Sequence, residues 1–379
     1  MPGGGMSHDF RYGHGSASQW RSAAQSCLAQ LGELPVGTNL GFLFVSDAFA
    51  EHLDDILAFF QGCIPGAHWV GTLGIGICST GQEYLDRPAI AVMVGSFAPD
   101  SFEVFPAIAD LGDIASGIAV PRPQRRAPNF AIVHGDPYTP DLPELIEAFA
   151  SQMSSGFVTG GLTSARSRSL QIADAVTQGG LSGVVFSPGV CVSTRLTQSV
   201  SPIGPRHVIT ECHQNIIISI DNRPALDVFY EEIGELLVRD LQRAAGYIFV
   251  GLPVPGSDTN DYLVRNLTGV DTGQKLIAIG ELLEAGQPLL FCRRDGGTAR
   301  EDMLRMLSEL KENLQGATPQ GGLYYSCLGR GESLFGPDSA ELKMIQEILG
   351  DFPLVGFFAN GEISHDRLYG YTGVLTLFT

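Results

Sequence analysis

Three short stretches of this 379-residue chain resemble one another: residues 69–76, 157–164 and 354–361. Each is an apolar run that ends in glycines and small or polar residues. Each copy follows a segment with helical periodicity and precedes another apolar run. Self-similarity of this kind indicates a repeated supersecondary unit, and it constrains the fold more than any single motif does.

The surroundings of each copy predict a strand, a helix and two further strands. In the first copy, residues 40–45 are an apolar run, and Ile56, Leu57 and Phe60 recur at helical spacing. Residues 69–73 and 89–97 supply the two further strands. The corresponding segments are residues 130–134, 142–153, 157–160 and 183–186 in the second copy, and 323–327, 339–349, 353–358 and 373–378 in the third. Extra strands and helices, including a predicted helix over 226–239, separate the last two copies.

The expected fold class is mixed α and β, with two domains of mixed, largely antiparallel sheets flanked by helices. The repeated strand–helix–strand–strand units contain hairpin-like strand pairs, which are antiparallel, and the chain length favours two domains. We expect an N-terminal arm and helix over residues 1–37, a first module over 38–240 and a second module over 241–379. His8 and His14 fall in the first 18 residues, which we expect to be disordered.

Charge and hydropathy exclude several classes of function. The chain has 23 basic and 41 acidic residues and a formal net charge of −18, which argues against binding to a nucleic-acid backbone. Its apolar runs are too short to span a bilayer, and its first residues contain no secretory signal. We therefore expect no nucleic-acid partner and no membrane segment.

The seven cysteines are widely spaced and form no Cys-x-x-Cys motif. This pattern signals neither a zinc site nor a redox pair. Free thiols in a reducing cytoplasm are the expected state, and we predict no metal and no cofactor.

The first candidate ligand loop contains Cys78, Ser79, Thr80 and Gly81. Glycines let backbone N–H groups converge and hydroxyls add donors, so such a loop could hold a carboxylate or another anion. It lacks the lysine of a phosphate-binding P-loop. A tight hairpin between two strands explains the same residues equally well.

The second candidate loop follows the second copy of the repeat and contains Thr163, Ser164 and Arg166. It adds a guanidinium group to the same type of turn, and arginine recognises carboxylates bidentately. An exposed surface arginine is the alternative interpretation.

The third candidate loop follows the third copy and contains Asn360, Gly361 and Glu362. If Glu362 is buried, it could pair with Arg330 or receive the ammonium group of a ligand. The Asn-Gly pair also signals a plain hairpin turn, which would place the same residues in solvent.

Cys327 ends a predicted strand, and Arg330 follows three residues later. A nearby positive charge would favour the thiolate, but nucleophilic catalysis also needs a base and an orienting partner. The histidines fall into no pattern known for cysteine hydrolases. We therefore expect Cys327 and Arg330 to line a ligand site and predict no catalytic residue.

Taken in order, these motifs resemble the FIST family. Residues 71–83 resemble the glycine–Cys–Ser–Thr–Gly–x–Glu turn of its N-terminal module. Residues 202–205, 208–210 and 222–226 resemble that module's Pro-Ile-Gly…Val-Thr…Pro-Ala-Leu segment, and residues 326–331, 334–336 and 353–363 resemble the C-terminal module. The chain departs from the family at Val200, where members often carry cysteine, and this lowers the weight of any cysteine chemistry.

The resemblance implies an intracellular small-molecule sensor in signal transduction, with amino acids as the suggested ligands. It spans nearly the whole chain and leaves no room for an output domain, so we expect a separate downstream signalling protein as partner. A zwitterionic ligand would place its carboxylate on arginine and backbone N–H groups and its ammonium on Glu362. Two alternatives stay open, a cysteine-dependent enzyme that uses Cys327 and a pure protein-interaction module.

Overall fold

The computed structural model describes residues 9–116, 120–123, 128–234, 247–254 and 262–379. The chain divides into two compact units, one that combines residues 1–197 with 302–379 and one that consists of residues 198–301. Sheets that are mixed or antiparallel, with helices beside them, confirm the predicted fold class. The expected boundary between residues 240 and 241 lies outside the described residues.

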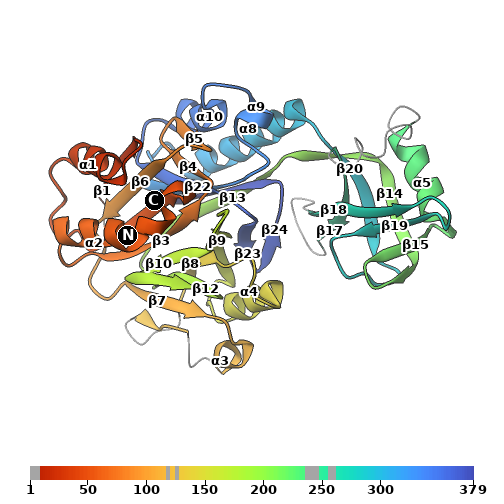
Figure 1. Ribbon diagram of the computed structural model, residues 1–379, viewed down its shortest axis with the longest axis horizontal. Coiled ribbons are helices and arrows are strands. Elements are labelled where there is room, and N and C mark those ends of the chain that lie inside the picture. The colour runs from red at the N-terminus through yellow and green to blue at the C-terminus, as the bar shows by residue number, and fades with distance from the viewer. Residues whose placement is uncertain (1–8, 117–119, 124–127, 235–246, 255–261) are drawn as a thin grey trace. The chain divides into compact units, whose positions relative to one another are not determined.

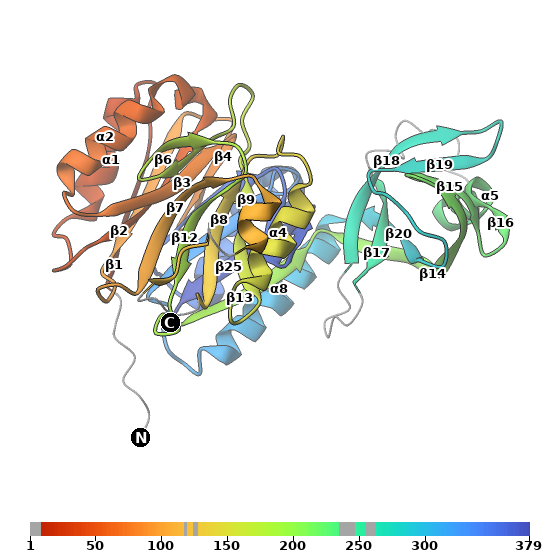
Figure 2. The same cartoon turned by 90° about the horizontal axis from the view of Figure 1, so that it is seen from below.

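The first unit contains three copies of one repeat (Figures 1 and 2). Each copy runs strand, helix, strand, helix, strand, hairpin, strand, so the repeat is longer than the sequence predicts. The first copy consists of β1 (Phe10–Ser16), α1 (Trp20–Leu31), β2 (Leu40–Ser46), α2 (Leu53–Cys63), β3 (His68–Gly74), β4 (Gly76–Ser79), β5 (Gln82–Leu85) and β6 (Ala89–Gly95), with the 3-10 helix η1 (Asp47–His52) before α2.

The second copy follows the same order. Its elements are β7 (Phe102–Ile108), α3 (Leu111–Ala115), β8 (Phe130–Gly135), α4 (Leu142–Ser151), β9 (Phe157–Leu162), β10 (Leu170–Ala173), β11 (Ala175–Gln178) and β12 (Leu181–Phe186).

The third copy is interrupted, because the second unit is inserted between its first strand and its first helix. Its elements are β13 (Val192–Gln198), α8 (Gly296–Asn313), β21 (Gly321–Cys327), α9 (Glu332–Phe335), α10 (Ala340–Leu349), β22 (Leu354–Ala359), β23 (Glu362–His365), β24 (Arg367–Tyr369) and β25 (Thr372–Phe378). The expectation of a disordered N-terminal arm is wrong for His14, which lies in β1 and pairs with β6. His8 lies outside the described residues.

The three sheets of this unit exchange hairpins in a cycle. Their strand orders are β1-β6-β2-β3-β10-β11, β7-β12-β8-β9-β23-β24 and β13-β25-β21-β22-β4-β5. In each repeat two strands are parallel: β2 with β3, β8 with β9, and β21 with β22. The second strand of each pair also pairs with a hairpin from another repeat: β3 with β10, β9 with β23, and β22 with β4. Every repeat therefore completes the sheet of a neighbour, which makes the three repeats one folding unit.

A glycine in each repeat allows the two parallel strands to approach. Gly71, Gly160 and Gly356 stand at equivalent register positions in β3, β9 and β22. A Cβ atom added at any of the three would lie 1.8 Å from a carbonyl oxygen of the facing strand. Because that oxygen is backbone, the contact could be relieved only by separating the strands. The glycines that reveal the repeat in the sequence are therefore a steric requirement of the fold.

The inner faces of the three sheets share one apolar core. At its centre lie Phe44, His134 and Tyr325, which occupy equivalent positions one residue beyond the glycine contacts. Their ring centroids are 5.5, 6.1 and 6.3 Å apart, and all three rings contact Phe357. Complete burial lowers the pKa of His134 to about 3, so this imidazole is a neutral core group.

The second unit is a closed antiparallel barrel. Its strands are β14 (Val200–His213), β20 (Pro288–Arg294), β17 (Ile248–Pro253), β18 (Tyr262–Asp271), β19 (Leu276–Ile279) and β15 (Ile216–Ile220), and β14 also pairs with β15 to close the ring. The short β16 (Arg223–Pro224) and α5 (Ala225–Ile233) complete the unit. Apolar residues from the strands and α5 fill its core. No helix in the described part of either unit is long and apolar enough to cross a membrane.

Candidate functional site

Each sheet of the first unit has an outer face that carries helices, and two of these three layers are apolar. In the first repeat, α1 and α2 pack on the sheet around Trp69 (Figures 1 and 2). In the second, α4 packs through Leu145 and Phe149 against Val133. The third layer differs, because fully buried charged side chains, Arg330 and Glu341, lie in it.

Buried residues recur with the same spacing in the second helix of every repeat. They are Ile56, Leu57, Phe60 and Ile64 in α2, Leu145, Ile146, Phe149 and Met153 at α4, and Glu341, Leu342, Ile345 and Leu349 in α10. Glu341 therefore occupies the position of Ile56 and Leu145. Strand register likewise matches Tyr324 of β21 to Leu43 and Val133.

The carboxylate of Glu341 is the acceptor at the centre of this third layer. Oε1 accepts from Arg330 Nε at 2.7 Å and from the Tyr324 hydroxyl at 2.6 Å. Oε2 accepts from the Gly331 N–H at 2.9 Å, and the Ser326 hydroxyl lies 3.1 and 3.2 Å from the two oxygens. The Arg330 guanidinium also lies 4.8 Å from the centroid of the Phe335 ring. The buried charge pair is thus well supplied with hydrogen bonds.

Stability alone does not explain this buried network. Replacing a buried ion pair by apolar residues of similar volume is often neutral or stabilising, because desolvation offsets the attraction. The first two repeats show that the same fold accepts Ile56 and Leu145 at the position of Glu341. The polar residues of the third layer are therefore not a requirement of the fold, and this layer is where we look for a functional site.

Glu83 adds a second buried carboxyl group to the layer. It lies on β5, in the hairpin that the first repeat contributes to the third sheet. Its N–H donates to the Ser339 hydroxyl at 3.0 Å, and its Oε1 accepts from the Glu332 N–H at 2.9 Å. Oε2 is buried and has no hydrogen-bond partner among the described residues. Burial, and then the nearby Glu341 carboxylate, raise the pKa of Glu83 to about 7.

The other two hairpins carry aliphatic residues where Glu83 stands. Glu83 pairs with Cys78, which faces Gly356, and the same register identifies Val176 and Leu368 as its equivalents. Both equivalents pack against the apolar layers of the neighbouring repeats. The carboxyl group at this position is therefore specific to the third layer.

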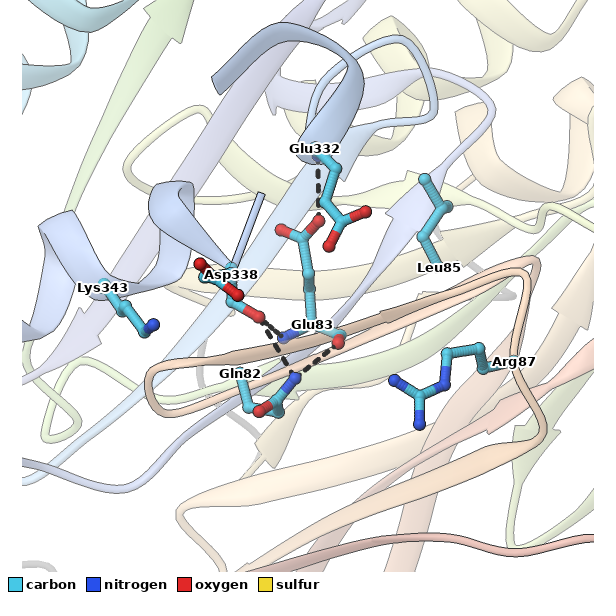
Figure 3. A pocket seen from close by; sticks show the side chains of 8 residues that line it. Gln82, Glu83, Leu85, Arg87, Glu332, Asp338 and Lys343 are labelled. Carbon is cyan, nitrogen blue, oxygen red and sulfur yellow. Dashed lines mark hydrogen bonds between the residues drawn. The ribbon is translucent and has the colours of Figure 1, made fainter. Parts of the chain in front are cut away.

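Glu83 lines a cavity of about 300 Å³ between the hairpin and the start of α10. Figure 3 shows this pocket, with Lys343 and Arg87 on either side of Glu83 in that view. The lining residues are Gln82, Glu83, Leu85, Arg87, Glu332, Asp338, Ser339 and Lys343. The wall thus carries carboxyl groups as well as cationic side chains. Among the described residues, no donor reaches the buried Oε2 of Glu83.

The first predicted ligand loop lies at the tip of this hairpin, and none of its four residues lines the pocket. Cys78 and Ser79 are buried in β4, and Thr80 exchanges hydrogen bonds with Phe352 and Leu354. At Gly81 the backbone φ is +63°, and a Cβ there would lie 2.4 Å from a Gln346 side-chain oxygen. These residues attach the hairpin to the third repeat, as the hairpin alternative predicts.

The second loop connects the ends of the three repeats. The Ser164 hydroxyl accepts from the Ile75 N–H at 2.9 Å and donates to the Phe358 carbonyl. The Thr163 hydroxyl is 2.6 Å from that of Thr72. The ends of the three strands therefore meet, but their polar groups form hydrogen bonds with one another.

Arg166 is an exposed residue that does not line the pocket, although its partner Asp86 lies between the lining residues Leu85 and Arg87 in the sequence. Its side chain is 59% exposed and forms ion pairs with Asp47 and Asp86. The alternative of an exposed surface arginine describes this geometry. Asn360 is also exposed, and its N–H donates to Leu162.

Cys327, Arg330 and Glu362 are brought close enough to affect one another's ionisation. Burial, and then the Glu362 carboxyl group, raise the pKa of Cys327 to about 12, which is the opposite of an activated thiolate. Arg330 forms an ion pair with Glu341, and its positive charge also acts to lower the pKa of Glu362.

Glu362 is fully buried and accepts two hydrogen bonds from Thr372, through its N–H and its hydroxyl. Burial raises the pKa of Glu362 to about 8. The adjacent Gly361 has a φ of +134°, and a Cβ there would lie 2.9 Å from Leu368. Among the described residues, none of the twelve predicted positions lines the pocket of Figure 3.

Glu83, Glu341 and Lys343 are not among the residues predicted from the sequence, yet they belong to the candidate site or to the charged layer beside it. Acidic residues in the first turn of a helix are common and normally solvated, so the position of Glu341 in the sequence does not indicate that it is buried. Its signal lies in the comparison of repeats, since Ile56 and Leu145 stand at the same helical position.

Comparison with known proteins identifies relatives of the whole chain. Residues 39–223 match the FIST N domain and residues 225–365 match the FIST C domain. An uncharacterised protein of Mycobacterium tuberculosis is 31% identical over 376 residues, which covers 94% of this chain and 96% of the relative. An uncharacterised protein of Mycobacterium bovis is 28% identical over 363 residues, which covers 92% of this chain and 91% of the relative.

Proposed function

Because this chain belongs to the FIST family, with its N and C domains in tandem, we propose that it is a small-molecule sensor whose ligand occupies the pocket beside Glu83. FIST domains are associated with sensing in signal transduction. One observation carries the choice of site: the buried carboxyl group of Glu83, which lies near Glu341, lines the pocket, while the equivalent residues Val176 and Leu368 pack in apolar layers.

The proposed ligand is an amino acid or a molecule with the same pair of charges. A cavity of about 300 Å³ suits a ligand of that size. Lys343 and Arg87 would receive its carboxylate, and Glu83, with Glu332 and Asp338, would receive its ammonium group. This assignment keeps the zwitterion predicted from the sequence but moves its site from Glu362 to Glu83.

The proposed signal passes in the cytoplasm to a separate signalling protein. All seven cysteines are free, and three of them are buried, which agrees with a reducing compartment. The partner would be recovered by purifying the tagged protein with and without its ligand. Recovery that depends on the ligand supports this step, and recovery that ignores the ligand contradicts it.

A thermal-shift screen of the purified full chain against the proteinogenic amino acids tests the sensor proposal. A ligand at 100 times its dissociation constant adds about 2.7 kcal/mol to the free energy of unfolding. We expect at least one amino acid to raise the melting temperature. If none does, and calorimetry also detects no binding, the proposed function is wrong.

Three variants localise the binding. Lys343→Met and Glu83→Gln each remove one charge from the pocket, and each should weaken binding by about tenfold to a hundredfold, as expected for a lost charge-assisted hydrogen bond. Glu51→Gln is the matched control, because Glu51 is exposed and does not line the pocket. Equal affinity in all three variants would place the ligand elsewhere.

A further inference from the structure

Resting on the proposed function, we infer that the pocket selects a ligand with a primary ammonium group, and that binding of this group displaces a proton from Glu83. Binding would then respond to pH as well as to ligand concentration. The inference concerns the regulation of the pocket in Figure 3.

The geometry of Glu83 calls for a donor. Its side chain is 5% exposed, and it lines the cavity. One carboxyl oxygen accepts from the Glu332 N–H, while the other, buried, has no partner among the described residues. An unsatisfied buried acceptor is costly, and an ammonium group supplies three donors. A trimethylated nitrogen carries the same charge but has no N–H to donate.

Charged and titratable groups surround this carboxyl group on the neighbouring elements. They are Glu332 of α9, Asp338 before α10, Glu341 and Lys343 of α10, Arg87 after β5, the thiol of Cys78 on β4, and Arg330, which pairs with Glu341. Glu341 is already matched by Arg330 at 2.7 Å. Burial and the carboxyl groups of Glu341 and Glu332 favour the protonated form of Glu83, with a pKa raised to about 7.

The proton balance of the step is simple. Near neutral pH the empty pocket holds Glu83 partly as the neutral acid, because its pKa is about 7. An ammonium cation beside it favours the carboxylate. The acid and the cation become an ion pair, the proton passes to solvent, and the ligand forms no covalent bond.

The sign of the pH dependence follows from this balance. Below the pKa of the empty pocket, binding must displace a proton, so affinity falls up to about tenfold for each unit of decreasing pH. Above that pKa the carboxylate already exists, and affinity levels off while the ligand keeps its ammonium proton. The pocket would therefore report a ligand less strongly in an acidified cell.

The repeats provide the reason to regard this as a property of the site. Val176 and Leu368 fill the equivalent hairpin positions with aliphatic side chains. The fold does not require an ionisable group there. Among these three equivalent hairpin positions, only that of Glu83 carries a carboxyl group, and its pKa is raised to about 7.

Isothermal titration calorimetry of the full chain tests the inference. The probes are the proteinogenic amino acids, titrated at about pH 5.5, 6.5 and 7.5 in buffers of different ionisation enthalpy, which reveal the protons released. From the pKa of about 7, we expect about 1 proton released per bound ligand at pH 5.5, about 0.75 at pH 6.5 and about 0.25 at pH 7.5. Each binding amino acid is then compared with its N-trimethylated counterpart, which should bind at least about tenfold more weakly.

Two variants separate the possible results. Glu83→Gln should bind about tenfold to a hundredfold more weakly at pH 7.5 and release no proton. Glu51→Gln is the control, because Glu51 is exposed and does not line the pocket, so this variant should keep both the affinity and the proton release. Binding that is independent of pH, or equal binding of the trimethylated probe, overturns the inference and leaves the proposed function standing. No binding at any pH overturns both.

Discussion

The outer layers of the three repeats have the same backbone arrangement, but the third layer contains buried charged side chains and the first two are apolar. All three place two parallel strands next to a helix, and all three use a glycine where the strands touch. The first two layers are then closed by apolar side chains, whereas the third encloses Glu341, Arg330 and Tyr324. The backbone therefore does not dictate the polar residues.

This difference shows how an internal repeat can serve as its own control. A buried charge cluster in a fold without repeats could be explained by local packing. Here Ile56, Leu145 and Glu341 occupy one helical position, and Val176, Leu368 and Glu83 occupy one hairpin position. Two coincident departures from the apolar pattern, in segments far apart in sequence, meet beside one pocket.

The largest expected effect comes from breaking the charged layer on one side. Arg330→Met leaves the Glu341 carboxylate fully buried without its cation, and this should lower the free energy of unfolding by about 3–5 kcal/mol. Urea unfolding of the full chain measures the change. A loss below about 1 kcal/mol would show that water reaches Glu341 and that the layer is less buried than the structure has it.

The next variant removes both charges of the third layer. Arg330→Met combined with Glu341→Leu leaves no buried charge, but the Tyr324 and Ser326 hydroxyls lose their acceptor, so the free energy of unfolding should recover part of the loss seen in the single variant. The same urea experiment measures it, with the single variant as reference. A double variant as unstable as the single one would mean that the network is required for packing, and the comparison of layers would lose its functional meaning.

Part of this fold was accessible from the sequence because its repeats carry a steric signature. Gly71, Gly160 and Gly356 stand out in the sequence, and the structure shows that a side chain there would strike the facing backbone. The exchange of hairpins was not accessible. Residues 76–85 alternate like any hairpin, and their pairing with β22 depends on the three-dimensional arrangement of repeats far apart in the chain.

The site was harder to predict than the fold because residue type does not reveal what a side chain contacts. Ser164 and Thr80 suit an anion site by chemistry, yet their hydroxyls join strands. Glu83 ends the glycine turn, and a carboxyl group in a hairpin is normally solvated, so its sequence position does not indicate burial. Only the long-range placement of β5 against α9 and α10 buries it.

A smaller effect is expected in the pH dependence of the free energy of unfolding, because Glu83 is ionisable and its aliphatic equivalents are not. Its pKa is raised from the ordinary 4.5 to about 7 on folding, so between these values the folded chain keeps a proton that the unfolded chain has lost. Stability from this group is therefore present below pH 4.5 and falls as the pH rises towards 7. Urea unfolding of wild type and Glu83→Gln at several pH values measures it, and the difference between them should change with pH across this window. A constant difference would contradict the raised pKa.

The smallest effect on stability is expected at Arg166, a predicted ligand residue that is exposed, whereas the charged residues of the third layer are buried. Its side chain is 59% exposed and pairs with Asp47 and Asp86 on the surface. Exposed ion pairs contribute about 0.2–1 kcal/mol because water and salt screen them, so Arg166→Ala should change the free energy of unfolding by no more than that and should leave ligand affinity unchanged. Salt provides the control, since high ionic strength should abolish the small difference. If Arg166→Ala instead weakens binding as much as Lys343→Met does, the ligand lies at the loop that residue chemistry indicates, and the contrast between charged and apolar layers does not mark the functional site.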